Sequence, residues 1–134
     1  MPEFSNNNTY QGGGADRTSE FDAQDIEQNK GISALAYLGI LFFLPLVACP
    51  GSKFGKFHAN QGLLLFIVMI TGNIAGSIIS AVFHIIPFIG GLVGTLIHSA
   101  IGIVILIFLI VGLVNTLNGR AKELPVIGGI ELLK

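Results

Sequence analysis

Hydrophobic positions along the chain gather into three apolar stretches, separated by short polar or basic segments. The two longest, residues 61–83 and 89–117, are joined by a short turn at residues 84–88 and contain no Asp, Glu, Lys or Arg. As helices they reach about 34 Å and about 43 Å, enough to cross the roughly 30 Å hydrocarbon core of a bilayer. The pattern therefore predicts a long transmembrane helical hairpin.

The third apolar stretch, residues 32–48, precedes the hairpin and is shorter. A helix of this length reaches about 26 Å, which is near the lower limit for crossing a bilayer. Pro45 lies close to its end, where a kink is tolerated. We predict that this stretch spans the membrane, so that the chain is an all-α polytopic protein with three transmembrane helices. A re-entrant or strongly interfacial segment is the alternative for residues 32–48, and a fourth short or re-entrant segment is the alternative for the chain as a whole.

The two ends of the chain differ from its apolar middle. Residues 1–30 are rich in Asn, Gln, Gly, Asp and Glu, which cannot build a packed core. We predict a mostly disordered acidic tail there, in which residues 19–29 are compatible with a short helix, ahead of a membrane domain at residues 31–134. Residues 118–134 are too short and too interrupted by Pro and Gly to span, which predicts an interfacial tail.

Composition supports lipid as the solvent for the middle of the chain. Hydrophobic residues make up 51% of the sequence and charged residues only 11%, against about 25% charged residues in soluble domains. No formal charge occurs between Lys56 and Arg120. The net charge of -1 and the lack of a basic stripe argue against nucleic acid as a partner. We predict a multi-pass protein of the cell membrane whose first partner is the lipid bilayer.

The distribution of Lys and Arg predicts an orientation. With three spans, the linker that carries Lys53 and Lys56 lies on the same side as the C-terminal tail, which carries Arg120, Lys122 and Lys134. Because cytoplasmic loops are enriched in Lys and Arg, this side is predicted to be cytoplasmic. The N-terminus is then outside and the C-terminus cytoplasmic.

Small residues recur at four-residue spacing on both long stretches, which places each set along one helix face. Two backbones can approach closely along such a stripe, so we predict helix packing there. Packing within the hairpin is the favoured interpretation, and an interface with another copy or with a membrane protein partner is the alternative. The residues are Gly72, Gly76, Ser80, Gly90, Gly94 and Gly102.

Asn73 and His98 are the conspicuous polar residues deep within the hairpin. Counted from the turn, they lie about 20 Å and about 17 Å along their helices, so an antiparallel hairpin brings them to a similar depth. We predict an intramembrane polar pair. Its simplest role is to hold the two helices together, and a role for His98 in proton or substrate passage is the functional alternative.

The sequence offers no catalytic or metal-binding set. All Asp and Glu residues lie in the two tails, so no carboxylate pair can act inside the membrane. His58, His84 and His98 fall at three different depths, and Cys49 is the single cysteine, which excludes a multi-cysteine zinc site. We therefore predict a non-enzymatic protein without a cofactor.

Three blocks of the chain carry a family resemblance: Asn-Lys-Gly-Ile-Ser-Ala-Leu-Ala-Tyr-Leu-Gly at residues 29–39, Lys-Phe-His-Ala-Asn-Gln-Gly-Leu at 56–63, and Leu-Asn-Gly-Arg-Ala-Lys-Glu-Leu-Pro-Val-Ile-Gly at 117–128. They resemble a group of small prokaryotic membrane proteins of unassigned function. That group is distantly similar to the twenty-kilodalton subunit of the chloroplast inner-envelope protein translocon. The plastid subunit has four helices, which keeps a fourth segment open for this chain.

The same blocks predict a surface for a partner or for lipid headgroups. His58 and Gln61 are three residues apart, so they share a face at the start of the second span. Neighbouring Phe rings suit the headgroup level, and basic residues of the C-terminal tail lie at the same membrane surface. Simple interfacial anchoring is the alternative role. The predicted surface comprises Phe54, Phe57, His58, Gln61, Arg120 and Lys122.

The function predicted from these features is non-enzymatic. We expect a scaffold or accessory subunit of a membrane complex, linked to protein translocation through the resemblance. The alternative is a homo-oligomeric pore or small transporter, in which the Gly-rich hairpin forms the interface and Asn73 and His98 line a polar path.

Overall fold

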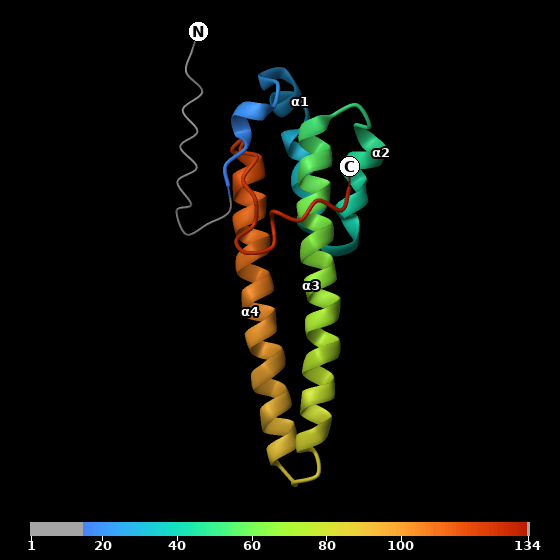
Figure 1. The fold of residues 1–134 in the computed structure, drawn as a ribbon, viewed down its shortest axis with the longest axis vertical. Coiled ribbons are helices and arrows are strands. Elements are labelled where there is room, and N and C mark those ends of the chain that lie inside the picture. The colour runs from blue at the N-terminus through green and yellow to red at the C-terminus, as the bar shows by residue number, and fades with distance from the viewer. Residues whose placement is uncertain (1–14, 134) are drawn as a thin grey trace.

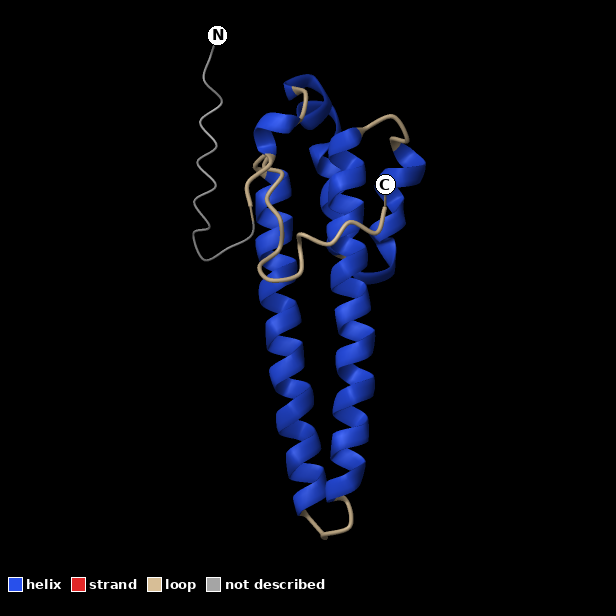
Figure 2. Cartoon of the chain, in the orientation of Figure 1, coloured by secondary structure: helices blue, strands red, loops and turns tan. Residues whose placement is uncertain are grey.

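Two long antiparallel helices dominate the structure, a computed structural model that describes residues 15–133 (Figures 1 and 2). Helix α3 is Lys53–Phe83 and helix α4 is Ile89–Leu117, and the turn at residues 84–88 joins them. The predicted all-helical hairpin is confirmed, and the start of α4 and the end of α3 agree with the hydrophobic pattern. The described residues form no strand and only an isolated bridge.

Helix α3 begins at Lys53, eight residues before the predicted second span, so the basic linker is helical. Ser52 is the reason, because its hydroxyl accepts a hydrogen bond from the Gly55 N–H at 2.8 Å and caps the helix. The helix is therefore about 46 Å long, which matches the roughly 40–45 Å of a whole bilayer with its headgroups.

The predicted span at residues 32–48 is not one helix. Helix α1 is Ala23–Ala34, and it is followed by the short helices η2 (Leu35–Tyr37), η3 (Gly39–Phe43) and α2 (Leu44–Ala48). Within residues 15–133, only α3 and α4 are long and apolar enough to cross a membrane, so the third transmembrane helix is not confirmed. The segment is broken because its backbone leaves the helical region at two consecutive residues. Leu38 has ψ 54° and Gly39 has φ 66°, a left-handed conformation that suits glycine.

This broken segment runs down along α3 and turns back. Its lowest part lies beside Phe66, whose ring centroid is 6.0 Å from that of Phe42, and its return places Pro45 close to Gly55. The segment thus accompanies α3 over its first half only, as Figure 1 shows. We call residues 35–48 the re-entrant segment, which is the alternative to a span that the sequence leaves open.

The described N-terminal residues lie beside the C-terminal tail. Arg17 N–H donates to the Ala121 carbonyl at 2.8 Å, Glu123 N–H donates to the Ala15 carbonyl at 2.9 Å, and Asp16 and Lys122 form an isolated antiparallel bridge. The prediction that the N-terminus and the C-terminal tail lie on opposite sides of the membrane is therefore wrong for residues 15–22. Both ends of the hairpin lie at the same end of the molecule (Figure 1).

The predicted disordered tail is helical from Ala23 onward, and Asp22 caps helix α1 by accepting a hydrogen bond from the Gln24 N–H at 2.9 Å. A short helix η1 (Thr18–Glu20) precedes it. The disorder predicted for residues 1–14 lies outside the described residues.

The hairpin has two parts of different width. We call residues 15–66 and 105–133 the head, because the re-entrant segment, α1 and the C-terminal tail surround the helices there (Figure 1). We call residues 67–104 the stem, which contains only α3, α4 and the turn. Large apolar side chains on the stem face outward, and only 6% of the most apolar 18-residue stretch of α4 is buried. Such exposure is unlike the core helix of a soluble protein and fits lipid as the surrounding solvent.

Candidate functional site: a buried polar cluster in the head

His58 lies at the centre of the head and is completely buried. Its Nε2 is 3.0 Å from the carbonyl oxygen of Arg120, and its Nδ1 is 2.7 Å from the Tyr37 hydroxyl and 3.1 Å from the Thr116 hydroxyl. A carbonyl oxygen can only accept, so Nε2 donates to it and Nδ1 accepts from Tyr37. One neutral imidazole of α3 therefore hydrogen-bonds both η2 and the C-terminal tail. The Thr116 hydroxyl of α4 lies beside it and donates to the Gly112 carbonyl at 2.6 Å.

Aromatic rings surround this imidazole. The ring centroids of Phe54 and Phe57 lie 4.5 Å and 5.0 Å from that of His58, in edge-to-face arrangements. Phe21, from the N-terminal stretch, packs against both phenylalanines. Phe54 and Phe57 are both buried, so the prediction that they anchor the chain among lipid headgroups is wrong.

Two adjacent amide side chains on α3 hold the C-terminal tail. Gln61 donates to the Gly128 carbonyl at 2.9 Å and accepts from the Leu124 N–H at 2.9 Å. Asn60 donates to the Ile130 carbonyl at 2.8 Å and accepts from the Leu132 N–H at 2.7 Å. These bonds satisfy backbone groups that the irregular tail cannot satisfy by itself, which explains how a tail containing Pro and Gly is fixed along α3.

The six residues predicted to form one partner or headgroup surface do not form one. Phe54, Phe57, His58 and Gln61 are interior. Arg120 contributes its backbone carbonyl to the cluster while its side chain is exposed, and the side chain of Lys122 is half-buried. Sequence reasoning was right that these segments meet but assigned them to the outside. It missed three partners: Tyr37, Asn60 and Thr116. Tyr37 and Asn60 belong to the resemblance blocks.

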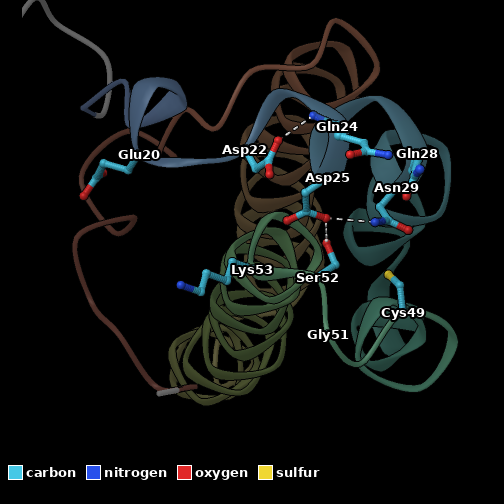
Figure 3. A pocket seen from close by; sticks show the side chains of 10 residues that line it. All are labelled: Glu20, Asp22, Gln24, Asp25, Gln28, Asn29, Cys49, Gly51, Ser52 and Lys53. Atoms are coloured by element: carbon cyan, nitrogen blue, oxygen red, sulfur yellow. Dashed lines mark hydrogen bonds between the residues drawn. The ribbon is translucent and has the colours of Figure 1, made fainter.

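Asp25 of α1 reaches across to the start of α3. Figure 3 shows its carboxylate between Ser52 and Asn29; Ser52 donates its hydroxyl, Asn29 donates its amide at 2.8 Å and the Phe54 N–H donates at 3.0 Å. Burial raises the pKa of this carboxyl, but the hydrogen bonds from Ser52, Phe54 and Asn29 outweigh burial and hold the pKa below its ordinary value. A carboxylate at a helix N-terminus also stabilises the helix dipole.

An open groove of about 770 Å³ lies beside this contact, between α1 and the start of α3 (Figure 3). Both oxygens of Asp25 are already used in the internal hydrogen bonds just described. In residues 15–133, no three His, Cys, Asp or Glu side chains come close enough together to hold a metal ion. The groove is lined by Glu20, Asp22, Gln24, Asp25, Gln28, Asn29, Cys49, Gly51, Ser52 and Lys53.

The structure places Asn73 and His98 in contact within the stem. His98 Nδ1 is 3.1 Å from Asn73 Oδ1, and the Asn73 amide donates to the Met69 carbonyl at 2.7 Å. Because the amide nitrogen is the donor to Met69, Oδ1 is the acceptor and His98 donates through Nδ1. Asn73 is exposed on the stem surface and His98 is half-buried. Their role stays a prediction.

Near the turn, small residues allow the two helices to pack closely. Gly76, Ser80, Gly90 and Gly94 are buried, and a Cβ on Gly76 would lie 2.9 Å from Ile97. These positions serve packing inside the hairpin.

The other two predicted small residues contribute less to this packing. Gly102 is exposed and has open space around it, so it does not pack within the hairpin. A four-residue step turns a helix by about 40° beyond one full turn, which rotates the stripe away from α3 before it reaches Gly102. At Gly72, a Cβ would meet only Ile101, at an ordinary contact distance of 3.5 Å.

The fold and this cluster define a class: a small hairpin membrane protein whose head is closed by a re-entrant segment and fixed by buried polar side chains. Residues 28–133 match the model of the Magnetosome magnetite crystal formation protein family, MamF/MmsF. The chain belongs to this family, whose members are accessory proteins of the magnetosome membrane and not enzymes.

Two relatives come from Paramagnetospirillum magneticum strain AMB-1. The magnetosome protein MmsF is 31% identical over 99 residues, which cover 74% of this chain and 81% of the relative. The magnetosome protein MamF is 31% identical over 97 residues, which cover 72% of this chain and 77% of the relative. No solved structure shows significant similarity to the chain.

The family match corrects the resemblance inferred from the sequence. The matched family is a magnetosome family, and no comparison points to a translocon subunit. The three blocks suggested the wrong family because their side chains serve packing inside the head. Tyr37, His58, Gln61 and Gly128 hold the head together, so they report a fold and carry no information about transport.

Proposed function

We propose that this chain is a non-enzymatic accessory protein of a magnetosome membrane and takes part in magnetite crystal formation there. The family description and the names of both relatives support this role. We further propose that it works as a scaffold, through contacts that its head makes with a membrane protein partner.

The observation that carries the scaffold proposal is the separation of charge along the hairpin. Every Lys, Arg, Asp and Glu in residues 15–133 belongs to the head, and the turn at residues 84–88 has none. At the far end of the stem the chain therefore offers one imidazole and apolar side chains, with no carboxylate to bind iron or a mineral face. Exposed charged groups that could recognise a partner are found on the head, among them Lys53, Lys56 and Arg120.

The same separation of charge supports an orientation. Lys and Arg are enriched on the cytoplasmic side of membrane proteins, so we propose that the head faces the cytoplasm and the turn faces the magnetosome interior. The C-terminal tail is then cytoplasmic, and the N-terminal stretch joins it on that side because residues 15–17 pair with residues 121–123.

Labelling of single cysteines on intact isolated magnetosomes tests this orientation. In a Cys49→Ser background, a cysteine at the exposed head position Gln28 should react with a membrane-impermeant maleimide before detergent is added. A cysteine at the exposed turn position Ile85 should react only after detergent opens the membrane. The opposite pattern would place the groove between α1 and α3, with its carboxylates, inside the magnetosome. Direct contact of this protein with the mineral would then no longer be disfavoured.

Complementation tests the function. In a magnetosome-forming strain that lacks its own MamF and MmsF, the chain should restore crystal length toward that of the parent, as measured by electron microscopy. A Lys53→Glu, Lys56→Glu variant should insert normally, because acidic residues are favourable at a helix N-terminus, yet leave crystals at the length of the deletion strain. The matched turn variant, Ile85→Ser with Phe88→Ser, should restore crystals fully. If the turn variant fails and the head variant succeeds, the scaffold proposal is wrong.

A further inference from the structure

The hairpin occupies the two leaflets of a bilayer unequally. Helix α3 alone is about as long as a whole bilayer is thick, so the turn lies at one headgroup region and Lys53 at the other. The re-entrant segment accompanies α3 only from Gly55 to Phe66. That stretch is about 17 Å long, which is roughly the depth of one leaflet.

The outward surface of the re-entrant segment is apolar. No charged residue occurs between Lys30 and Lys53. Ile40 is 64% exposed and Val47 is 71% exposed, and Phe43 is also exposed. These side chains continue the apolar surface of the two long helices at the same end of the molecule, so acyl chains of the same leaflet cover both.

The C-terminal tail widens the hairpin in the same leaflet as the re-entrant segment. Asn60 and Gln61 hold it at their level of the helix, and Leu124 packs with Tyr37 and Leu65 in one apolar cluster. Its apolar side chains point outward as well: Val126 is 99% exposed, and Ile130 and Leu132 are exposed. A tail that turns these side chains outward is suited to lipid rather than to water.

In the stem, by contrast, no other described element accompanies α3 and α4, which end in the short turn (Figure 1). The chain therefore has the shape of a wedge across the bilayer. Its head adds the re-entrant segment and the tail to two helices in one leaflet, and its stem leaves the two helices alone in the other.

We propose that this wedge makes the protein prefer strongly curved membranes, with the head in the convex leaflet. Bending a bilayer expands the convex leaflet relative to the concave one, so a body that is wider in the convex leaflet fills the extra area. Shallow apolar insertion into one leaflet is sensitive to curvature for this reason. The ligand of the apolar head surface is thus the acyl-chain region of a curved lipid leaflet. Only the membrane location of the chain is needed for this proposal, not its role in crystal formation.

Single-vesicle imaging tests the proposal with purified full-length protein. A Cys49→Ser, Gln28→Cys chain carrying one dye is reconstituted into vesicles of phosphatidylcholine and phosphatidylglycerol with a broad range of diameters. Protein fluorescence per unit of lipid should rise several-fold from the largest vesicles to the smallest. In the smallest vesicles the dye should be quenched by an external impermeant quencher, because the head lies on the outside. A density independent of diameter, or equal inside and outside populations, would overturn the proposal.

Two matched variants separate the wedge from the hairpin itself. The head variant Ile40→Ser, Phe43→Ser, Val47→Ser should lose most of the dependence on diameter. The stem variant Ile74→Ser, Ile78→Ser, Leu96→Ser removes equally exposed apolar side chains and should keep it.

Circular dichroism and size-exclusion chromatography confirm that each variant is folded, and Val47→Ser alone replaces the triple head variant if that variant is not. Equal diameter dependence in the head and stem variants would overturn the proposal.

Discussion

Replacing His58 with phenylalanine should open the head while leaving the hairpin in the membrane. The substitution keeps a ring in the aromatic surroundings but removes both ring nitrogens, so the Tyr37 hydroxyl and the Arg120 carbonyl lose their partner in the interior. Each stranded buried polar group costs about 1–3 kcal/mol, so we expect a loss of about 2–6 kcal/mol in the stability of the head. Cys49 is the single cysteine and is half-buried, so the rate at which it reacts with a thiol dye measures head opening.

His84→Phe is the matched control for this experiment. The same chemical change is made at an exposed turn position. The thermal unfolding of this variant and the reactivity of its Cys49 should therefore stay at the values of the parent. A Tyr37→Phe substitution gives a second check, because Tyr37 and His58 share one hydrogen bond and their losses should be less than additive. If His58→Phe reacts with the dye as slowly as the parent does, the buried cluster does not hold the head together.

The hairpin could be predicted from the sequence because membrane insertion depends on local composition. A long stretch without formal charge must lie in lipid, and Pro87 marks the turn that divides it. The re-entrant segment has the same composition, so hydrophobicity alone could not distinguish it from a span. Its path depends on Gly39 adopting a positive φ and on Ala36 approaching Gly62, and both are decided by tertiary contacts.

The buried cluster could be predicted in part. The spacing of His58 and Gln61 correctly indicated one helix face, and a basic helix start suggested that this face meets water or headgroups. The partners that bury it, Tyr37, Thr116 and Arg120 at the start of the tail, are separated from His58 by 21, 58 and 62 residues of sequence, so no local pattern could identify them. Asp25 was missed for the opposite reason, since a polar stretch rich in acidic residues resembles a disordered tail until its carboxylate meets the start of α3.

The burial of the resemblance blocks also limits where function can lie. Side chains that fix the head are unavailable to partners, so recognition falls to exposed charged groups on the head and to its outward apolar side chains. These are residues that carry little sequence signal, because many polar or apolar side chains serve equally well on a surface. The proposed membrane protein partner would contact the exposed charged groups, and the proposed curved leaflet would contact the outward apolar side chains.

Substituting alanine at two glycines should give opposite results, although the chemical change is identical. A Cβ on Gly62 would collide with the backbone carbonyl of Ala36, whereas a Cβ on Gly102 would meet open space. We expect Gly62→Ala to lose about 1–3 kcal/mol or more of stability through overpacking. Gly102→Ala should be neutral or gain up to about 1 kcal/mol, because alanine favours the helix. Unfolding in a detergent series, followed by circular dichroism and by the reactivity of Cys49, measures both.

The size of the Gly62 effect depends on what can move. A flexible side chain would rotate away from a new methyl group, but the atom in the way belongs to the backbone of η2. The re-entrant segment must therefore shift away from α3, and the Tyr37 hydroxyl must leave His58 with it. Gly62→Ala should consequently raise the reactivity of Cys49 as His58→Phe does, while Gly102→Ala leaves it unchanged. Equal behaviour of the two alanine variants would mean that the re-entrant segment does not pack against α3, and the wedge shape of the head would be wrong as well.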